Sequence, residues 1–380
     1  MLPGYLLWLR AAFLLTLCGT ALCATPTPSG GIPARPLAGG GEIPMLAMGG
    51  NDFAGWFELA GKGAMIQTFH GYGNGLHLAP QLQKIGRENV FVSTGIPCGC
   101  CGSDAPKITP MNASLAMGYI DDELAQLNTS YADLLLFHHR CKTPAETADV
   151  WTALQTAKAA GKARHIGVSN FNTHDLSTLL AAPTTTEPIE VLEAHFGVGM
   201  MDFDTLSFAN QHNIHPVSFS SLSESSTDLS GLRTTVAAIA AAHNVTTAQV
   251  LYRYVSSKNI TVLSTYEPQH QDWAEEDVAI FQLVLSSTEL DTLDKLTEGK
   301  RTCTDCYTFE CQACAQALRK LGCPIGELHG GFVWGRSNPK GMECTACAKD
   351  SKHKAVVLAV CGGAGGGESL ETMVPKACGI

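Results

Sequence analysis

Residues Gly161–Phe171 read G-K-A-R-H-I-G-V-S-N-F, and this stretch decides the fold. A helical run leads into it and ends at Gly161, because glycine readily adopts the left-handed conformation that terminates a helix. The next residues, His165–Val168, form a short apolar segment typical of a buried strand. Ser169 and Asn170 follow at the carboxyl end of that strand, where parallel α/β barrels place their ligands. The stretch therefore predicts a barrel strand with two small polar groups at its functional end.

The composition is that of a large globular domain. The chain has 380 residues, of which 45% are hydrophobic and only 16% are charged. A barrel of roughly 250 residues with additional segments fits this length. The net charge of −10 argues against a nucleic-acid partner and is typical of an acidic soluble protein.

Short apolar segments alternate with helical ones along the main part of the chain. We expect strands at Met45–Met48, Met65–Phe69, Val90–Ser93, Ala132–Phe137, His165–Ser169, Glu190–His195, Pro216–Ser220 and Thr261–Ser264. We expect helices at Leu76–Ile85, Leu115–Leu127, Val150–Ala160, Leu206–His212 and Thr247–Val255. A capping box of Ser286 and Glu289 predicts one more helix, over about residues 287–296. The alternation predicts an α/β fold with a parallel (β/α)8 TIM barrel.

The stretch Gly161–Phe171 resembles the fifth barrel strand of the aldo-keto reductase superfamily. Three other segments resemble that family in the same order: the opening hairpin with the first strand over residues 36–49, the fourth strand over 131–138, and the helix before the last strand over 247–254. The likeness spans about Arg35 to Thr297. It implies an oxidoreductase that transfers hydride between a nicotinamide cofactor and a small-molecule carbonyl or alcohol.

The family's catalytic residues are a tyrosine, a histidine, a lysine and an aspartate, and two of these have counterparts here. Tyr72 matches the tyrosine that donates a proton, and His138 matches the histidine. Gln67 stands in place of the aspartate and Gly95 in place of the lysine. A phenol with a pKa near ~10 is a poor acid until a cation lowers that pKa.

The loss of both members of the Asp–Lys pair avoids leaving one buried charge without its partner. It indicates a relaxed or redirected site. The alternatives are an ordinary tyrosine at the barrel mouth for Tyr72 and a strand-end histidine bonded to the backbone for His138.

The resemblance also implies which residues hold the cofactor. Ser169 and Asn170 match the pair that binds the carboxamide, and Phe219 matches the residue that stacks on the nicotinamide ring. Glu276, followed by Asp277, matches the family's Glu-Asn that meets the adenine.

Two cofactor contacts of the family are missing. The family's glutamine on the sixth strand is replaced by Val191. No lysine or arginine occurs from Thr261 to Val278, where the family binds the 2′-phosphate of NADP. A dianionic phosphate without such a partner is poorly held, so we expect either NAD or a weakened NADP site. The second hypothesis for the whole chain is a catalytically inactive barrel that serves as a secreted binding or regulatory protein.

The fifteen cysteines divide the chain, because nine of them follow Arg301. We expect a signal peptide over residues 1–24, a Pro/Gly-rich linker over 25–41, the barrel over 42–299 and a cysteine-rich tail over 300–380. The tail contains three C-x-x-C units. In a secreted chain these favour disulfides, with zinc binding as the alternative. An odd count leaves one thiol free or paired elsewhere.

Four further cysteines lie in the loops after the third and fourth predicted strands. We expect a disulfide from Cys98, Cys100 or Cys101 to Cys141. A metal site with nearby histidines and a redox-active thiol are the alternatives. The spacing matches no strong metal pattern, so no metal is predicted.

The amino terminus predicts the secretory route. Arg10 precedes a short apolar run, and small residues around Ala21–Ala24 offer a cleavage site. An uncleaved anchor is the alternative, although the run is short for a membrane span. Sequons at Asn112, Asn128, Asn244 and Asn259 fit passage through a secretory lumen. We expect a monomer that is extracellular or in the secretory pathway, with onward plastid or vacuolar targeting left open.

Overall fold

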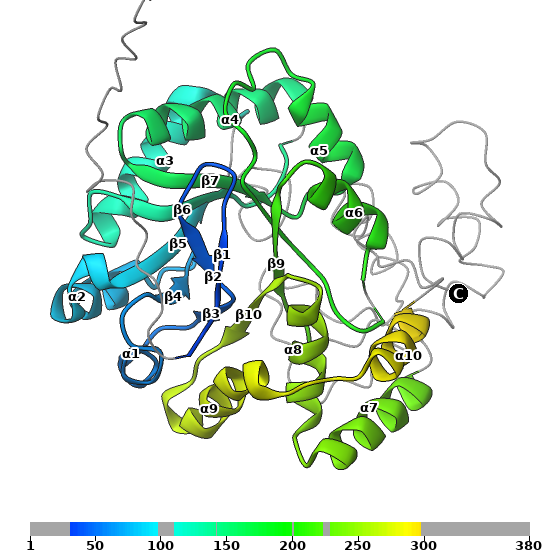
Figure 1. The fold of residues 1–380 in the computed structure, drawn as a ribbon. Helices are drawn as coiled ribbons and strands as arrows, with labels where there is room; N and C mark the ends of the chain where they lie inside the picture. The colour runs from blue at the N-terminus through cyan, green and yellow to red at the C-terminus, as the bar shows by residue number, and fades with distance from the viewer. Residues whose placement is uncertain (1–30, 98–109, 142, 200, 223–228, 298–380) are drawn as a thin grey trace, which may run out of the picture.

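The structure, a computed structural model, describes residues 31–97, 110–141, 143–199, 201–222 and 229–297. Within them, parallel strands close into a barrel in the order β10-β3-β4-β5-β6-β7-β8-β9, with helices around the outside (Figure 1). The strands are β3 (Leu46–Gly49), β4 (Ala64–Gln67), β5 (Val90–Ile96), β6 (Ala132–Phe137), β7 (Ala163–Ser169), β8 (Val191–Ala194), β9 (His215–Phe219) and β10 (Thr261–Thr265). The predicted (β/α)8 TIM barrel is confirmed.

All eight predicted strands are present, and their ends differ from expectation by a few residues. β5 extends past Ser93 because Ile96 still pairs with Phe137 of β6. β4 ends at Gln67 rather than Phe69, because the chain turns there and the Tyr72 amide donates to the Phe69 carbonyl at 3.0 Å. These differences move no residue to the other face of the barrel wall.

The helices begin where side chains satisfy their first backbone amides. Capping boxes join Thr143 to Glu146, Asn172 to Asp175, and Thr246 to Gln249 at the starts of α4, α5 and α8. The predicted box of Ser286 with Glu289 is also formed. The helices are α1 (Ala54–Ala60), α2 (Gly75–Ile85), α3 (Ala113–Gln126), α4 (Pro144–Ala159), α5 (Thr173–Leu180), α6 (Phe203–Gln211), α7 (Leu229–His243), α8 (Thr247–Ser257), α9 (Gln271–Ala279) and α10 (Ser287–Thr297). Among the described residues, every helix is too short or too polar to span a bilayer.

Several helices are followed by an asparagine in the left-handed conformation. Asn128, Asn213, Asn244 and Asn259 have φ of 49°, 57°, 54° and 63° after α3, α6, α7 and α8. Asparagine is the residue other than glycine that tolerates this conformation best. Backbone geometry therefore accounts for the asparagine at three of the four sequons without reference to a glycan.

A hairpin closes the amino-terminal end of the barrel. β1 (Ala34–Pro36) pairs antiparallel with β2 (Glu42–Pro44), so the segment expected to be a linker over 25–41 contains the first strand of the domain. Its Pro/Gly content marks the turn of a hairpin. Leu37 and Ile43 are buried against the inward side chains of the barrel, which include Ala47, Met65, Phe91, Leu134, Val191 and Val217.

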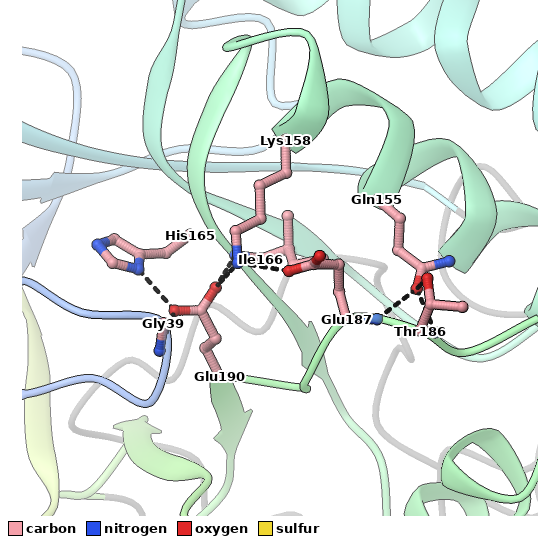
Figure 2. Close-up of polar contacts among 8 residues, drawn as sticks. All are labelled: Gly39, Gln155, Lys158, His165, Ile166, Thr186, Glu187 and Glu190. Atoms are coloured by element: carbon pink, nitrogen blue, oxygen red, sulfur yellow. Dashed lines mark hydrogen bonds and ion pairs between the residues drawn. The ribbon is translucent and has the colours of Figure 1, made fainter. Parts of the chain in front are cut away.

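The carboxylate of Glu190 holds this hairpin to the barrel (Figure 2). Glu190 is fully buried just before β8, and it accepts hydrogen bonds from the Gly39 amide at 3.0 Å and from Lys158 Nζ of α4 at 2.9 Å. His165 Nδ1 of β7 lies 2.7 Å from the same carboxylate. A Cβ on Gly39 would overlap the Glu190 side chain, so glycine is required for this approach. One carboxylate thus joins the hairpin, a strand and a helix.

Burial alone would raise the pKa of Glu190, but its hydrogen bonds and charge interactions with His165 and Lys158 outweigh burial and hold that pKa below its ordinary value. A carboxylate with a lowered folded-state pKa stabilises the fold above its unfolded pKa. That contribution is lost as the pH falls through the folded value.

We therefore predict that Glu190→Gln lowers the free energy of unfolding by about 3 kcal/mol at neutral pH, because it leaves Lys158 without its buried partner. Urea unfolding measures this change, and the difference from wild type should shrink in acid. Glu187→Gln is the matched control, because Glu187 binds the same Lys158 from an exposed position. This control variant should lower the free energy of unfolding by no more than about 1 kcal/mol. Equal losses in the two variants would contradict the role given to Glu190.

Candidate active site

The predicted site residues gather at the carboxyl ends of the strands. Tyr72 follows β4, His138 follows β6, Ser169 ends β7 and Phe219 ends β9. Parallel barrels place their chemistry at this end because every strand delivers its last residues there. The structure therefore brings Tyr72, His138, Ser169 and Asn170 into one cluster, as described below.

Tyr72 stands in a turn between two glycines with positive φ, Gly71 at 95° and Gly73 at 73°. Its side chain is 58% exposed. The Tyr72 ring lies edge-on to the His138 ring, with centroids 6.0 Å apart, and 5.6 Å from the ring of Phe69. The turn thus presents the phenol at the mouth beside His138.

His138 is a neutral imidazole at physiological pH. Burial and the neighbouring His139 hold the pKa of His138 well below its ordinary value. The Phe69 ring stacks on it, with ring centroids 4.0 Å apart. A neutral imidazole at this place supplies a hydrogen-bonding group without a positive charge.

The Phe69 ring also lies where a side chain from position 95 would start. A Cβ on Gly95 would overlap that ring and would lie 2.6 Å from the carbonyl oxygen of Leu136 on the paired strand. Packing therefore requires a glycine at position 95. Phe69, which the sequence analysis did not single out, occupies the space.

Gln67 is bonded to a buried acid that the sequence analysis also missed. Its amide nitrogen donates to Glu193 Oε2, while its amide oxygen is buried without a hydrogen-bond partner among the described residues. Glu193 lies on β8 and is 3% exposed. The hydroxyl of Ser169 donates to Glu193 Oε1 at 3.2 Å. A glutamate inside the apolar run Val191–Ala194 was the available signal for this contact.

Burial raises the pKa of Glu193 to about 7, although its hydrogen bonds with Gln67 and Ser169 act in the opposite direction. An acid with a perturbed pKa in such a cluster is typical of a functional site.

Asn170 connects three strands at the mouth. Its φ is 60°, a conformation that asparagine tolerates. Its side-chain amide donates to the His138 carbonyl at 3.0 Å and to Ser169 Oγ at 3.1 Å, and its backbone amide donates to the Glu193 carbonyl at 2.8 Å. The predicted carboxamide pair is thus held rigidly between β6 and β8.

Phe219 is partly exposed and stacks on His195, with ring centroids 4.8 Å apart and an angle of 17° between the rings. Burial lowers the pKa of His195 to about 4, so this ring is neutral as well. The stack fixes the orientation of the Phe219 ring at the mouth.

Glu276 lies on α9 and contacts α8. Its Oε2 accepts from the Thr246 hydroxyl at 3.0 Å, and in the described part of the chain no hydrogen bond connects it to Ser169 or Asn170. The structure therefore does not bring Glu276 into the mouth cluster. The neighbouring Asp277 is buried, and burial raises its pKa to about 7.

The cysteine predictions fall mostly outside the described residues. Cys141 is disulfide-bonded, whereas Cys98, Cys100, Cys101 and the tail over 300–380 are not described. The pairing of Cys141 therefore stays a prediction. Across the described ranges, no group of three or more His, Cys, Asp or Glu side chains is arranged to hold a metal ion.

We predict that Gly95→Ala lowers the free energy of unfolding by about 1–3 kcal/mol, because the added methyl must displace the Phe69 ring and press on the Leu136 carbonyl. Urea unfolding is the measurement. Gly118→Ala in α3 is the control, since a Cβ there meets nothing within 4 Å. That helical substitution should stabilise by up to about 1 kcal/mol. An unchanged stability for G95A would show that the position is not closed by packing.

Comparison with known proteins identifies the family. Residues 72–298 match the Aldo/keto reductase family, and the chain belongs to it. An aldo-keto reductase from Mycobacterium sp. (strain MCS) is 28% identical over 76% of this chain and 99% of its own length. Methylglyoxal reductase YeaE from Escherichia coli (strain K12) is 30% identical over 50% of this chain and 67% of its own length.

Solved structures share the fold. An aldo-keto reductase from a Medee basin deep-sea metagenome library superposes with a TM-score of 0.60 at 21% identity, covering 71% of this chain and 96% of that one. The aldo/keto reductase of Brucella melitensis gives 0.59 at 23% identity, covering 70% and 99%. The family consists of oxidoreductases that use NAD(P)H and act on small-molecule carbonyl compounds.

Proposed function

We propose that the protein is a nicotinamide-dependent oxidoreductase that interconverts a small carbonyl compound and its alcohol. Tyr72 donates the proton to the carbonyl oxygen, and neutral His138 orients that oxygen. The observation that carries the proposal is the cluster at the mouth, in which Asn170 bonds both Ser169 and the His138 carbonyl while Tyr72 lies edge-on to His138. Proton donor and carboxamide pair thus come from one rigid group of strand ends.

The residues present fit the nicotinamide end of the cofactor. Ser169 and Asn170 offer polar atoms at the mouth, and Phe219 offers an oriented aromatic ring. The buried Gln67 amide oxygen still lacks a donor among the described residues. When bound, the cofactor supplies the hydride, and the protein residues position it and manage the proton.

The part of the cofactor site that would face the 2′-phosphate lacks cationic side chains between Thr261 and Val278. This segment contains no lysine or arginine, and Thr246 already donates to the Glu276 carboxylate. This supports NAD over NADP, because a 2′-phosphate needs a cationic or bidentate partner.

We predict that NADH binds more tightly than NADPH to the purified protein. Trp273 lies on α9, the helix of Glu276, so its fluorescence should report binding at the adenine end. Titration with both cofactors measures the two dissociation constants. Tighter binding of NADPH would contradict the preference, and binding of neither at millimolar concentration would contradict the proposed function.

We predict that Tyr72→Phe lowers kcat for reduction of a simple aldehyde by about 10²-fold or more, because a general acid contributes that much. The dissociation constant for NADH should not change. Tyr119→Phe is the matched control: Tyr119 lies against His70, with ring centroids 4.9 Å apart, and outside the cluster. It should keep wild-type turnover. Equal turnover in Y72F and wild type would remove Tyr72 from the reaction.

A second function has its own supporting observation. The Phe69 ring takes the space at Gly95 and Gln67 is bonded to Glu193, so neither position supplies an ammonium that would lower the pKa of the Tyr72 phenol. These contacts support the second hypothesis, a catalytically inactive barrel that serves as a secreted binding or regulatory protein. Cofactor binding without turnover of any simple aldehyde would favour this function over the first.

We also propose that the chain enters the secretory pathway, on the apolar run after Arg10 and the exposed asparagines of its sequons. We propose as well that the catalytic tetrad is degraded at Gln67 and Gly95 and that Cys141 forms a disulfide with a cysteine of the 98–101 segment. We propose that disulfides also stabilise the cysteine-rich tail over 300–380. Expression of the full chain in a secreting cell tests the secretory route through the position of amino-terminal cleavage and a mobility shift with an endoglycosidase. An uncleaved, unglycosylated product would contradict it.

A further inference from the structure

The mouth of the barrel contains a buried acid, Glu193, that forms no ion pair with any residue in the described ranges. Glu193 is 3% exposed, and its carboxyl is bonded to the Gln67 amide and the Ser169 hydroxyl, both of which are uncharged. Its partner in register on β9 is the apolar Val217, and its partner on β7 is Ser169. No ion pair reaches Glu193 from any described residue.

The other titratable groups considered at the strand ends are either uncharged or bonded to partners other than Glu193. His138 and His195 are held uncharged by burial. His165 of β7 and Glu190, which immediately precedes β8, are bonded to each other at the opposite end of the barrel. Glu123 of α3 is bonded to Thr94 of β5 on the outer side of the barrel. Glu193 is therefore the acid of the mouth cluster whose protonation state is not fixed by a neighbouring charged residue in the described ranges.

Resting on the proposed function, we infer that Glu193 is the charge partner of the oxidised nicotinamide ring. Below its pKa, the carboxyl keeps its proton when the site is empty or holds the uncharged reduced ring. It is ionised when the cationic oxidised ring binds beside Ser169. The O–H bond of the carboxylic acid breaks, the proton passes to solvent, and the carboxylate charge of −1 offsets the ring charge of +1.

Two observations make this exchange favourable. Burial holds the Glu193 pKa at about 7, so little free energy is needed to ionise it near neutral pH. The carboxyl is also one hydrogen bond away from Ser169, the residue assigned to the carboxamide, at 3.2 Å. In a buried environment opposite charges attract strongly, whereas a protonated acid offers a cationic ring no such attraction.

The experiment is to measure dissociation constants for NAD⁺ and NADH with the wild-type chain from about pH 6 to pH 8. Below the pKa, affinity for NAD⁺ should rise about tenfold per pH unit and then level off, while affinity for NADH stays constant. Calorimetry in two buffers of different ionisation enthalpy should show nearly one proton released per NAD⁺ bound at about pH 6, and none for NADH.

The variant E193Q removes the charge and keeps the shape. It should bind NAD⁺ independently of pH, without proton release, and with lower affinity than wild type at about pH 8. E123Q is the matched control, because burial also raises the pKa of Glu123, although its Thr94 bond opposes this shift. It should retain the wild-type pH dependence and proton release.

The outcomes separate the two proposals. Suppose that both cofactors bind and that NAD⁺ and NADH show the same pH profile and the same proton count with the wild-type chain. The role inferred for Glu193 is then wrong, and the proposed function stands. The same holds if E193Q retains proton release. If neither cofactor binds, both proposals fall. The wild-type proton count decides the inference even where E193Q does not fold.

Discussion

Closure of the barrel is the constraint on which the rest of the structure depends. Eight strands enclose an interior so narrow that inward side chains from neighbouring strands must share each volume. At Gly95 that volume belongs to the ring of Phe69, and at Gln67 the polar group must find its partner across the barrel in Glu193. A substitution at one strand end therefore changes the packing and hydrogen bonds of residues on other strands. The chemistry of the mouth depends on side chains from several strands together.

The two buried glutamates near β8 show how that interior treats charge. Glu190, at the amino end, is surrounded by Lys158, His165 and a backbone amide, so it stays ionised and fastens the hairpin. Glu193 lies three positions further along the chain, at the other end, and its hydrogen-bond partners among the described residues are uncharged. The same residue type is a structural anion in one place and a titrating acid in the other, and its partners decide which.

The sequence was sufficient for the fold, because the eight apolar segments and the capping box at Ser286 are local patterns. The family resemblance supplied Tyr72, His138 and Ser169, which the structure places at strand ends on one side of the barrel. Phe69 and Glu193 were missed because their roles arise from contacts across the barrel, between residues far apart in the chain. The resemblance placed an opening hairpin over residues 36–49, and the structure adds that the first strand of this hairpin, Ala34–Pro36, lies within the segment expected to be a linker. Glu276 was placed by family pattern alone, and its contact with Thr246 is not visible in a linear pattern.

The ring of Phe69 over Gly95 has a consequence for redesign of this site. A lysine introduced at position 95 would meet an occupied volume, so the aromatic ring would have to be replaced as well. Replacing Phe69 would also take away the ring that stacks on His138. Each of the two single substitutions therefore disturbs the mouth, and a cation can be placed there only by changing both positions together.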